Sequence, residues 1–195
     1  MIMTKEFPIF PLNSVLCPKG RLPLQIFEQR YLSMISRCLK SHEGFVIVLI
    51  KNGKEASGEC TFFDVGSYAR VVDFQQLPNG FLGITAEGEC KVSISQAHRQ
   101  SDGLYVAKVE ALGLETPTET PEQYSELADL LEDLLRHPVI QALGMSVDFH
   151  DARDVGWRLV ELLPLAMEDK QYLLTLEDPV YRLEQIRYLI HALAE

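Results

Sequence analysis

The sequence predicts an α+β protein in which a β-rich first part, residues 1–112, precedes an α-helical second part, residues 113–195. Short apolar segments separated by glycine and proline turns fill the first part, which is typical of a barrel or a folded-over sheet. Apolar residues three or four positions apart fill the second part, which is the spacing of amphipathic helices. The composition, with 47% hydrophobic and 24% charged residues, is that of an ordinary globular protein.

Two apolar strands and one helix open the chain. The predicted strands are residues 7–16 and 22–27, and Pro18 and Gly20 between them favour a turn. The apolar residues that follow lie three or four apart, so we expect a helix that ends near residues 41–44. Proline has no N–H to donate, so the strands that contain it should be edges, strand ends or bulged segments. These prolines are Pro8, Pro11 and Pro23.

The rest of the first part reads as further strands. Residues 45–50 form a continuous apolar run, which is typical of a strand buried on both faces, and we expect this strand to be central. Asn79 and Gly80 accept the positive φ angles of a tight turn, so the chain should reverse there. The other predicted strands are residues 60–65, 66–74, 81–87, 89–95 and 104–112. The first part therefore contains seven or eight predicted strands and one predicted helix.

The second part begins with a linker-like stretch, residues 113–121, and continues as helices. Thr120 is the predicted N-cap of the first helix, Pro121 its first residue, and Gln123 the side chain that completes a capping box. Asp151 is the predicted N-cap of a later helix. The predicted helices are residues 121–135, 138–143, 152–163, 167–176 and 179–193. Together they predict a helical bundle.

The opening stretch, residues 7–35, resembles the signature of the Lon N-terminal domain, also called the Lon substrate-binding domain. That signature reads roughly FPL, a few residues, PG, LPL, IFE and RY. Lys19, inserted between Pro18 and Gly20, and Gln29, where a proline is common, depart from it at turn or helix-start positions. The matching positions are Phe10, Pro11, Leu12, Pro18, Gly20, Leu22, Pro23, Leu24, Ile26, Phe27, Glu28, Arg30 and Tyr31. Later segments that resemble the family are residues 65–71, 77–80, 82–94 and 159–187.

The resemblance covers nearly the whole chain and implies both a fold and a function. The implied fold is a PUA-like β-barrel or folded sheet with one helix over residues 1–112, and a helical bundle over residues 113–195. The implied function is a non-catalytic module that binds unfolded or specific protein segments and aids protein quality control or proteolysis. A Lon-type protease and a second copy of the chain are further candidate partners. The candidate binding or signature residues are Phe10, Leu12, Pro23, Phe27, Glu28, Arg30 and Tyr31.

Two of these candidates, Glu28 and Arg30, also have a structural interpretation, which we favour. Glu28 would lie in the first helical turn, where a negative charge suits the helix dipole. Arg30 would pair with a carboxylate across the fold. The binding interpretation places Glu28, Arg30 and Tyr31 at the rim of the barrel, as a charged and aromatic contact.

The catalytic modules of Lon proteases have no counterpart in the sequence. The ATP-binding motif G-x-x-x-x-G-K-[S/T] is absent, because Gly53 and Lys54 lack the preceding glycine and are followed by Glu55. We therefore expect a stand-alone member of the family with no ATPase or protease activity, no catalytic residues and no cofactor.

Histidine and cysteine spacings give neither a metal motif nor a disulfide framework. The densest group of candidate metal ligands is Asp148, His150, Asp151 and Asp154. A helix start explains Asp151 and Asp154 without a metal, so we predict no metal site. An uncharacterised enzyme is the least favoured hypothesis, and it would need a cleft in which a reactive group has a strongly shifted pKa. The candidate groups are His98, Cys60 and Asp148.

The net charge is −10, and all the excess acidity belongs to the second part. Residues 1–112 contain 12 Lys and Arg against 11 Asp and Glu, whereas residues 113–195 contain six against 17. Nucleic-acid binding depends on Lys and Arg, so the charge argues against the alternative function, a PUA-like RNA-binding or small-ligand-binding protein. No apolar run reaches the ~20 residues of a membrane helix, and the N-terminus lacks a secretory pattern. We expect a cytoplasmic protein without a membrane partner.

Overall fold

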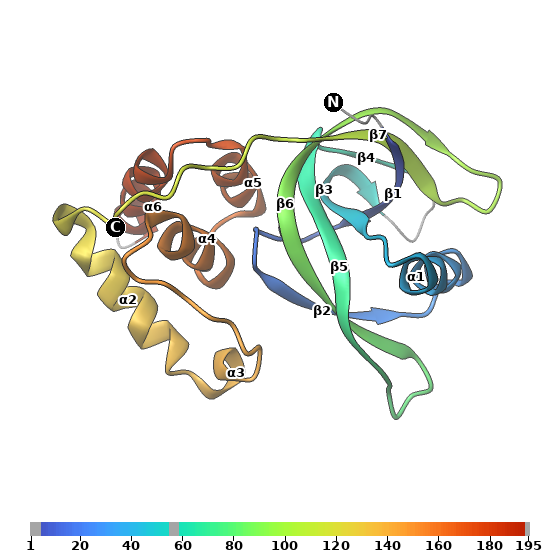
Figure 1. Ribbon diagram of the computed structural model, residues 1–195, viewed down its shortest axis with the longest axis horizontal. Helices are drawn as coiled ribbons and strands as arrows, with labels where there is room; N and C mark the ends of the chain where they lie inside the picture. The colour runs from blue at the N-terminus through green and yellow to red at the C-terminus, as the bar shows by residue number, and fades with distance from the viewer. Residues whose placement is uncertain (1–4, 55–58, 194–195) are drawn as a thin grey trace. The chain divides into compact units, whose positions relative to one another are not determined.

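The computed structural model describes residues 5–54 and 59–193 and has an α+β structure with a mostly antiparallel sheet (Figure 1). The chain divides into two compact units, Met1–Leu112 and Gly113–Glu195, which we call unit 1 and unit 2. Unit 1 contains all seven strands of the sheet and one α-helix, and unit 2 contains the remaining helices.

The sheet of unit 1 brings the first and last strands of the unit together. The elements are β1 (Lys5–Leu12), β2 (Arg21–Ile26), α1 (Gln29–Ser41), β3 (Phe45–Lys54), β4 (Glu59–Phe62), β5 (Val65–Gln76), β6 (Leu82–Arg99) and β7 (Tyr105–Ala111). The strand order is β1-β7-β6-β5-β3-β4, and β2 pairs with β6. β1 also pairs with β3, in parallel, so the path of strand pairing from β1 through β7, β6, β5 and β3 returns to β1.

β1 accommodates two prolines because each half of the strand pairs on a different side. Its first half, up to Ile9, pairs with β7 and contains Pro8, whereas its second half, from Ile9 onwards, pairs with β3 and contains Pro11. β2, which contains Pro23, pairs with β6 alone among the strands that the structure describes. Each proline therefore lies where the strand has a partner on one side, and the edge-type position predicted for all three is confirmed.

β6 is one strand of 18 residues, although the sequence predicted two strands that break at Gly88. Gly88 pairs through its backbone with the turn before β2: its N–H donates to the Gly20 carbonyl (3.0 Å), and its carbonyl accepts from the Lys19 N–H (2.7 Å). A Cβ on residue 88 would collide with the carbonyl oxygen of Cys17. The glycine therefore marks a close approach of two backbones rather than the end of a strand.

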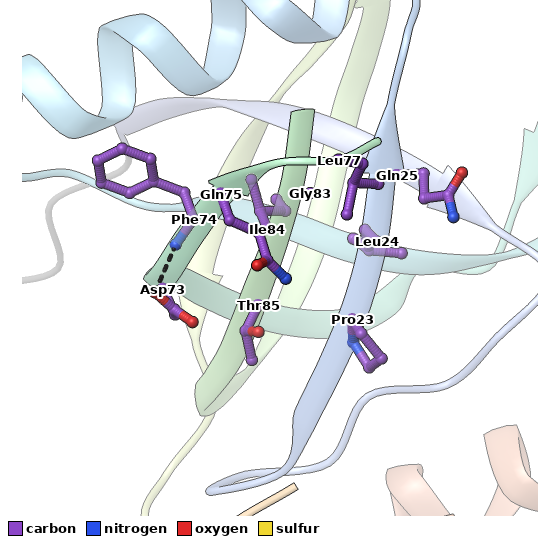
Figure 2. Close-up of a pocket in the computed structure, with 10 residues that line it drawn as sticks. All are labelled: Pro23, Leu24, Gln25, Asp73, Phe74, Gln75, Leu77, Gly83, Ile84 and Thr85. Atoms are coloured by element: carbon purple, nitrogen blue, oxygen red, sulfur yellow. Dashed lines mark hydrogen bonds between the residues drawn. The ribbon is translucent and has the colours of Figure 1, made fainter. Parts of the chain in front are cut away.

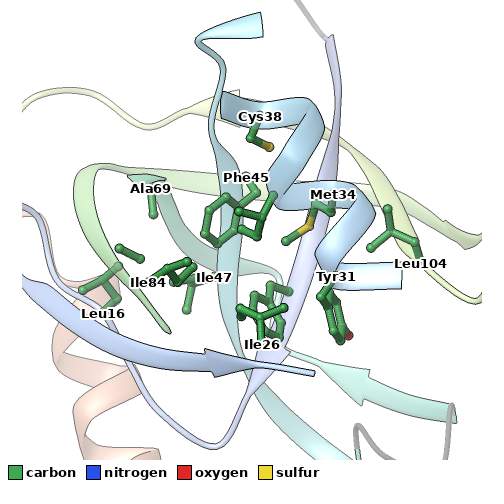
Figure 3. Close-up of a cluster of buried hydrophobic side chains, with 13 residues drawn as sticks. Leu16, Ile26, Tyr31, Met34, Cys38, Phe45, Ile47, Ala69, Ile84 and Leu104 are labelled. Carbon is green, nitrogen blue, oxygen red and sulfur yellow. The ribbon is translucent and has the colours of Figure 1, made fainter. Parts of the chain in front are cut away.

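The core of unit 1 consists of two apolar clusters that share β3. Phe45 and Ile47 point into the cluster that packs against α1, and Figure 3 shows Phe45 beside Met34 of that helix. Val46 and Val48 point into the second cluster, on the other face of the strand. Residues 45–50 are all buried, so the predicted two-sided central strand is confirmed.

Unit 2 is a set of helices that follows an extended segment. The elements are a 3-10 turn at Glu122–Tyr124, α2 (Ser125–Leu135), α3 (Pro138–Gln141), α4 (Ala152–Leu162), α5 (Met167–Thr175) and α6 (Pro179–Leu193). The predicted capping box at Thr120 is wrong, because α2 begins at Ser125. The Thr120 backbone N–H and hydroxyl instead donate to the carbonyls of His150 (2.8 Å) and Phe149 (3.0 Å).

The linker-like stretch, residues 113–121, is fastened to the helices of unit 2. The carboxylate of Glu115 pairs with the guanidinium of Arg182, with Nη1 to Oε2 at 3.0 Å. Arg182 is fully buried, and its guanidinium carbon lies 3.3 Å from the centre of the Trp157 ring. The Glu115 carbonyl accepts from Arg153 Nη1 (2.9 Å). A segment with a polar, proline-rich sequence is thus an integral part of the unit.

Candidate functional site

The β5–β6 hairpin and β2 together form the hollowed surface of unit 1. β5 and β6 run side by side to a turn that extends beyond the other strands, and β2 pairs with the same part of β6 (Figure 1). A groove of about 310 Å³ lies on this three-stranded region (Figure 2). We call it the β2–β5 groove, and its lining residues are Pro23, Leu24, Gln25, Asp73, Phe74, Gln75, Leu77, Gly83, Ile84 and Thr85.

Strand register explains the shape of the groove. In β6, Gly83 pairs with Gln25 of β2 on one side and with Gln75 of β5 on the other. Directly paired residues of antiparallel strands project from the same face, so the two glutamines flank a position that has no side chain. Leu77 folds back over this position, with its Cδ2 3.0 Å from where a Cβ of residue 83 would lie. Gly83 therefore forms the floor of the groove, and Leu77 closes one end.

The next pairs along the strands provide the other end of the groove. Thr85 of β6 pairs with Pro23 of β2 and with Asp73 of β5. Pro23 is exposed, and Asp73 accepts a hydrogen bond from the Phe74 backbone N–H at 2.9 Å. This end therefore combines an apolar ring, a hydroxyl group and a carboxylate within one row of the sheet.

A second hollow, of about 300 Å³, lies beside the tip of the hairpin. The rings of Phe27 and Phe81 line it with their centres 5.6 Å apart, and Leu32 of α1 contributes to its wall. Phe27 is 59% exposed, Phe81 42%, and Phe74 of the neighbouring groove 60%. We call the pair Phe27 and Phe81 the aromatic patch. Large apolar side chains that gather on a surface mark an interaction site more often than isolated ones do.

Asp73 is the single ionisable residue among those that line the two hollows. The nearest charged side chains of the same strands form ion pairs. Arg21 of β2 pairs with Glu87 of β6 (2.8 Å), and Arg70 of β5 pairs with Glu89 of β6 (2.9 Å). The lining is therefore largely apolar, with amide and hydroxyl groups that can both donate and accept hydrogen bonds and with one negative charge.

The sequence-predicted candidate residues fall into two groups. Pro23 lines the β2–β5 groove and Phe27 lines the second hollow, so the structure brings both to the hollowed surface. Phe10 and Tyr31 lie in the core, where their rings stack with centres 4.1 Å apart and planes at 22°. Leu12 is partly buried against the same cluster.

Glu28 and Arg30 form a structural link at the start of α1. Arg30 is buried, and its Nε donates to Glu28 Oε2 at 2.8 Å while Nη1 donates to the Gly103 carbonyl at 2.9 Å. The carboxylate that pairs with Arg30 is thus two residues away in sequence, and the contact across the fold is with a backbone carbonyl. This arrangement fixes the beginning of α1 against the turn that precedes β7.

Sequence reasoning missed Phe74, Phe81, Asp73 and Gly83, which shape the hollowed surface. A signal was present, because Phe74 and Phe81 flank the polar turn at residues 77–80. Aromatic side chains this close to a hairpin turn project beyond the core that the rest of the sheet covers. The register that places Asp73 and Gly83 in one groove was not readable from the sequence, because it depends on the bulge in β5 between Val71 and Asp73.

Two partly or fully buried thiols, and the carboxylates considered as metal ligands, have structural environments. Burial raises the pKa of the Cys38 and Cys90 thiols, so both stay protonated at neutral pH and are weak nucleophiles. Asp151 caps α4 by accepting from the Arg153 backbone N–H (2.9 Å), and Asp154 accepts from the Asp148 backbone N–H (3.3 Å). Within residues 5–54 and 59–193, no group of three His, Cys, Asp or Glu side chains is arranged to hold a metal ion.

Comparison with known proteins identifies the family. The family model described as the ATP-dependent protease La (LON) substrate-binding domain matches residues 6–192. The chain belongs to the Lon substrate-binding domain family. The resemblance seen in the sequence is thereby confirmed, and the match spans both units.

Full-length Lon proteases are related to this chain over a small part of their own length. Lon protease 1 of Bdellovibrio bacteriovorus is 26% identical over 175 residues, which cover 86% of this chain and 22% of that protein. Lon protease of Erwinia amylovora is 23% identical over 199 residues, covering 96% of this chain and 25% of that protein. The chain thus spans about a quarter of the length of these two relatives, and the part matched by the family model is the substrate-binding domain.

Solved structures of Lon N-terminal domains share the fold. The crystal structure of a Lon N-terminal domain protein from Xanthomonas campestris superposes with a TM-score of 0.79 at 30% identity, over 94% of this chain and 98% of that one. The N-terminal domain of the Mycobacterium avium complex Lon protease gives a TM-score of 0.63 at 13% identity, over 93% and 96% of the two chains. The second likeness concerns the fold alone. In the described part of the chain, no helix has the length and apolar character needed to span a membrane.

Proposed function

We propose that this protein is a non-catalytic recognition module that binds unfolded or extended protein segments on the hollowed surface of unit 1. The observation that carries the proposal is the aromatic patch, in which the paired rings of Phe27 and Phe81 are exposed and line the second hollow. Membership of the Lon substrate-binding domain family supports a role in recognising protein substrates. In the cell, this role would select chains for quality control or for a Lon-type protease.

The size of the hollows favours extended segments over folded partners. Each hollow of about 300 Å³ accommodates one or two side chains, and residues of the β5–β6 hairpin contribute to both. An extended segment presents successive side chains a few ångströms apart, whereas a folded domain buries its apolar side chains. The exposed rings would therefore contact apolar side chains that only an unfolded or unpaired segment offers.

We also propose that the sheet of unit 1 is a PUA-like barrel. The path of strand pairing that leads from β1 back to β1 supports this interpretation. The fold alone does not favour RNA as a ligand, because the residues that line the two hollows include no Lys or Arg. Protein segments remain the better candidate for this surface.

The proposal predicts that removing the paired rings weakens peptide binding. The variant with Phe27→Ser and Phe81→Ser should bind short, unstructured, fluorescein-labelled peptides rich in Phe and Leu about tenfold more weakly than the unaltered protein. Each aromatic contact is worth about 0.5–1.5 kcal/mol, and about 1.4 kcal/mol corresponds to a tenfold change. Fluorescence anisotropy gives the dissociation constants, and circular dichroism checks that the variant is folded.

The matched control is Tyr188→Ser, which removes an exposed aromatic side chain (69%) from α6. It should leave the dissociation constant unchanged. Equal binding by the unaltered protein and the double variant would show that the aromatic patch is not the binding surface. Binding of single-stranded RNA, but of no peptide, would replace the proposal with the PUA-like RNA-binding alternative.

A further inference from the structure

The β2–β5 groove has the shape and the chemistry of a subsite for a basic side chain. We propose that it binds a lysine or arginine side chain of the recognised segment, next to apolar residues that contact the aromatic patch. This inference rests on the proposed function and adds a specificity to it. The protein would then prefer extended segments in which basic and apolar residues alternate closely.

The length of the groove matches a long, unbranched side chain. One end lies over Gly83, where Leu77 offers an apolar wall, and the other end lies at the row of Pro23, Thr85 and Asp73. The two rows are two strand residues apart, about 7 Å. An extended lysine or arginine side chain covers this span, with its methylene groups against Leu77 and its charged head beside Asp73.

The polar groups of the groove suit a ligand that donates hydrogen bonds. The Asp73 side chain is exposed, and one of its carboxylate oxygens accepts a hydrogen bond from the Phe74 backbone N–H. Its other oxygen can accept a hydrogen bond from a ligand. Gln25 and Gln75 carry amide oxygens and Thr85 a hydroxyl, all of which accept from an ammonium or guanidinium group. Lysine has only donors at its head, and arginine likewise, so both complement this set.

The charge of the groove favours a positively charged ligand. The neighbouring charges of the sheet cancel in the pairs Arg21–Glu87 and Arg70–Glu89, which leaves the Asp73 carboxylate to set the local charge. An acidic side chain would be repelled by the like charge of Asp73, so a segment with Glu at this position should bind more weakly.

The test uses three peptides that share the same apolar residues and differ at one central position, which is Lys, norleucine or Glu. Norleucine keeps the methylene groups of lysine and lacks the charge. The intact protein should bind the Lys peptide about three- to tenfold more tightly than the norleucine peptide, and the Glu peptide most weakly. This preference should shrink as the salt concentration rises.

The variant Asp73→Asn isolates the carboxylate. Asparagine still accepts the hydrogen bond from Phe74, so folding is preserved, and the preference for Lys over norleucine should fall below about twofold. The matched control is Asp129→Asn, which removes the same charge from an exposed position of α2 and should keep the preference.

Each outcome decides between the two proposals. Equal affinity for the Lys and norleucine peptides, or a preference that survives Asp73→Asn, overturns the basic subsite but leaves the apolar recognition of peptides in place. Loss of the preference in both aspartate variants shows that net charge alone causes it, which also overturns the subsite. Failure of all three peptides to bind overturns the proposed function itself.

Discussion

Two glycines of β6 serve different purposes by lacking a side chain. Gly83 leaves the space that becomes the floor of the β2–β5 groove. Gly88 lets the turn before β2 approach the strand closely enough for two backbone hydrogen bonds, at 2.7 and 3.0 Å. One residue type thus creates a hollow at one position and a tight backbone contact five residues later.

The close contact at Gly88 predicts a sensitive position. Gly88→Ala should lower the free energy of unfolding by about 1–3 kcal/mol, because the added Cβ meets the Cys17 carbonyl, which belongs to the backbone and cannot rotate away. Gly113→Ala is the control, since a Cβ there has no neighbouring atom within 4 Å. Urea unfolding followed by circular dichroism measures both variants. Equal stability of the two would mean that the turn moves without cost.

The family signature shows how far single residues could be interpreted from the sequence. The sequence predicted that Glu28 and Arg30 matter for the fold, and the local ion pair explains why. Phe10 and Tyr31 were candidates for either binding or the family signature, and the structure places both in the core. Pro23 lines the β2–β5 groove because side chains of β2 alternate between the core and the outer face, and Phe27, directly after β2, lines the second hollow. A motif identifies positions that the family needs, but it does not separate packing from binding.

At the scale of elements, helix starts that depend on local contacts were predictable. Asp151 precedes α4 and accepts from the N–H two residues later, as the sequence indicated. Thr120 has the same chemistry, yet its groups bond to His150 and Phe149, which are some 30 residues away in the chain. Long-range pairing of this kind overrides a local capping signal, and no periodicity in the sequence reports it.

The start of α4 gives a prediction at this scale. Asp151→Ala should lower the free energy of unfolding by about 1–2 kcal/mol, because the helix loses its N-cap. The same change removes the ion pair with Arg153. Asp151→Asn keeps the capping oxygen, so it should cost less than the alanine variant. Thermal unfolding of the two variants measures their stabilities. If the Asn variant is as unstable as the Ala variant, the lost stability comes from the ion pair with Arg153 rather than from the N-cap.

At the scale of the whole molecule, the sequence indicated the two kinds of structure along the chain but not the role of the segment between them. Composition suggested a linker at residues 113–121, because the stretch is polar and rich in proline and threonine. The structure instead shows Glu115 paired with the buried Arg182. A hydropathy scale gives every arginine the same polar value, so the sequence did not reveal that Arg182 is buried.

This pair predicts the largest single loss of stability. Glu115→Ala should lower the free energy of unfolding by about 3–5 kcal/mol, because it leaves the Arg182 charge buried without its carboxylate. The control is Glu126→Ala, whose partner Arg187 is 3.8 Å away at an exposed position, and which should cost about 0–1 kcal/mol. Chemical unfolding monitored by Trp157 fluorescence measures both. Similar losses for the two variants would show that the Glu115 pair contributes no more than a surface contact.

The divided pairing of β1 has a consequence for the order in which the nascent chain can fold. The second half of the strand finds its partner in β3, which leaves the ribosome soon afterwards, whereas the first half pairs with β7, near the end of unit 1. At roughly 5–20 residues per second, synthesis separates the two partners by several seconds. During that interval the first half of β1, which includes Phe7, has not yet met its partner strand β7. A chaperone that binds apolar segments of nascent chains could bind it then.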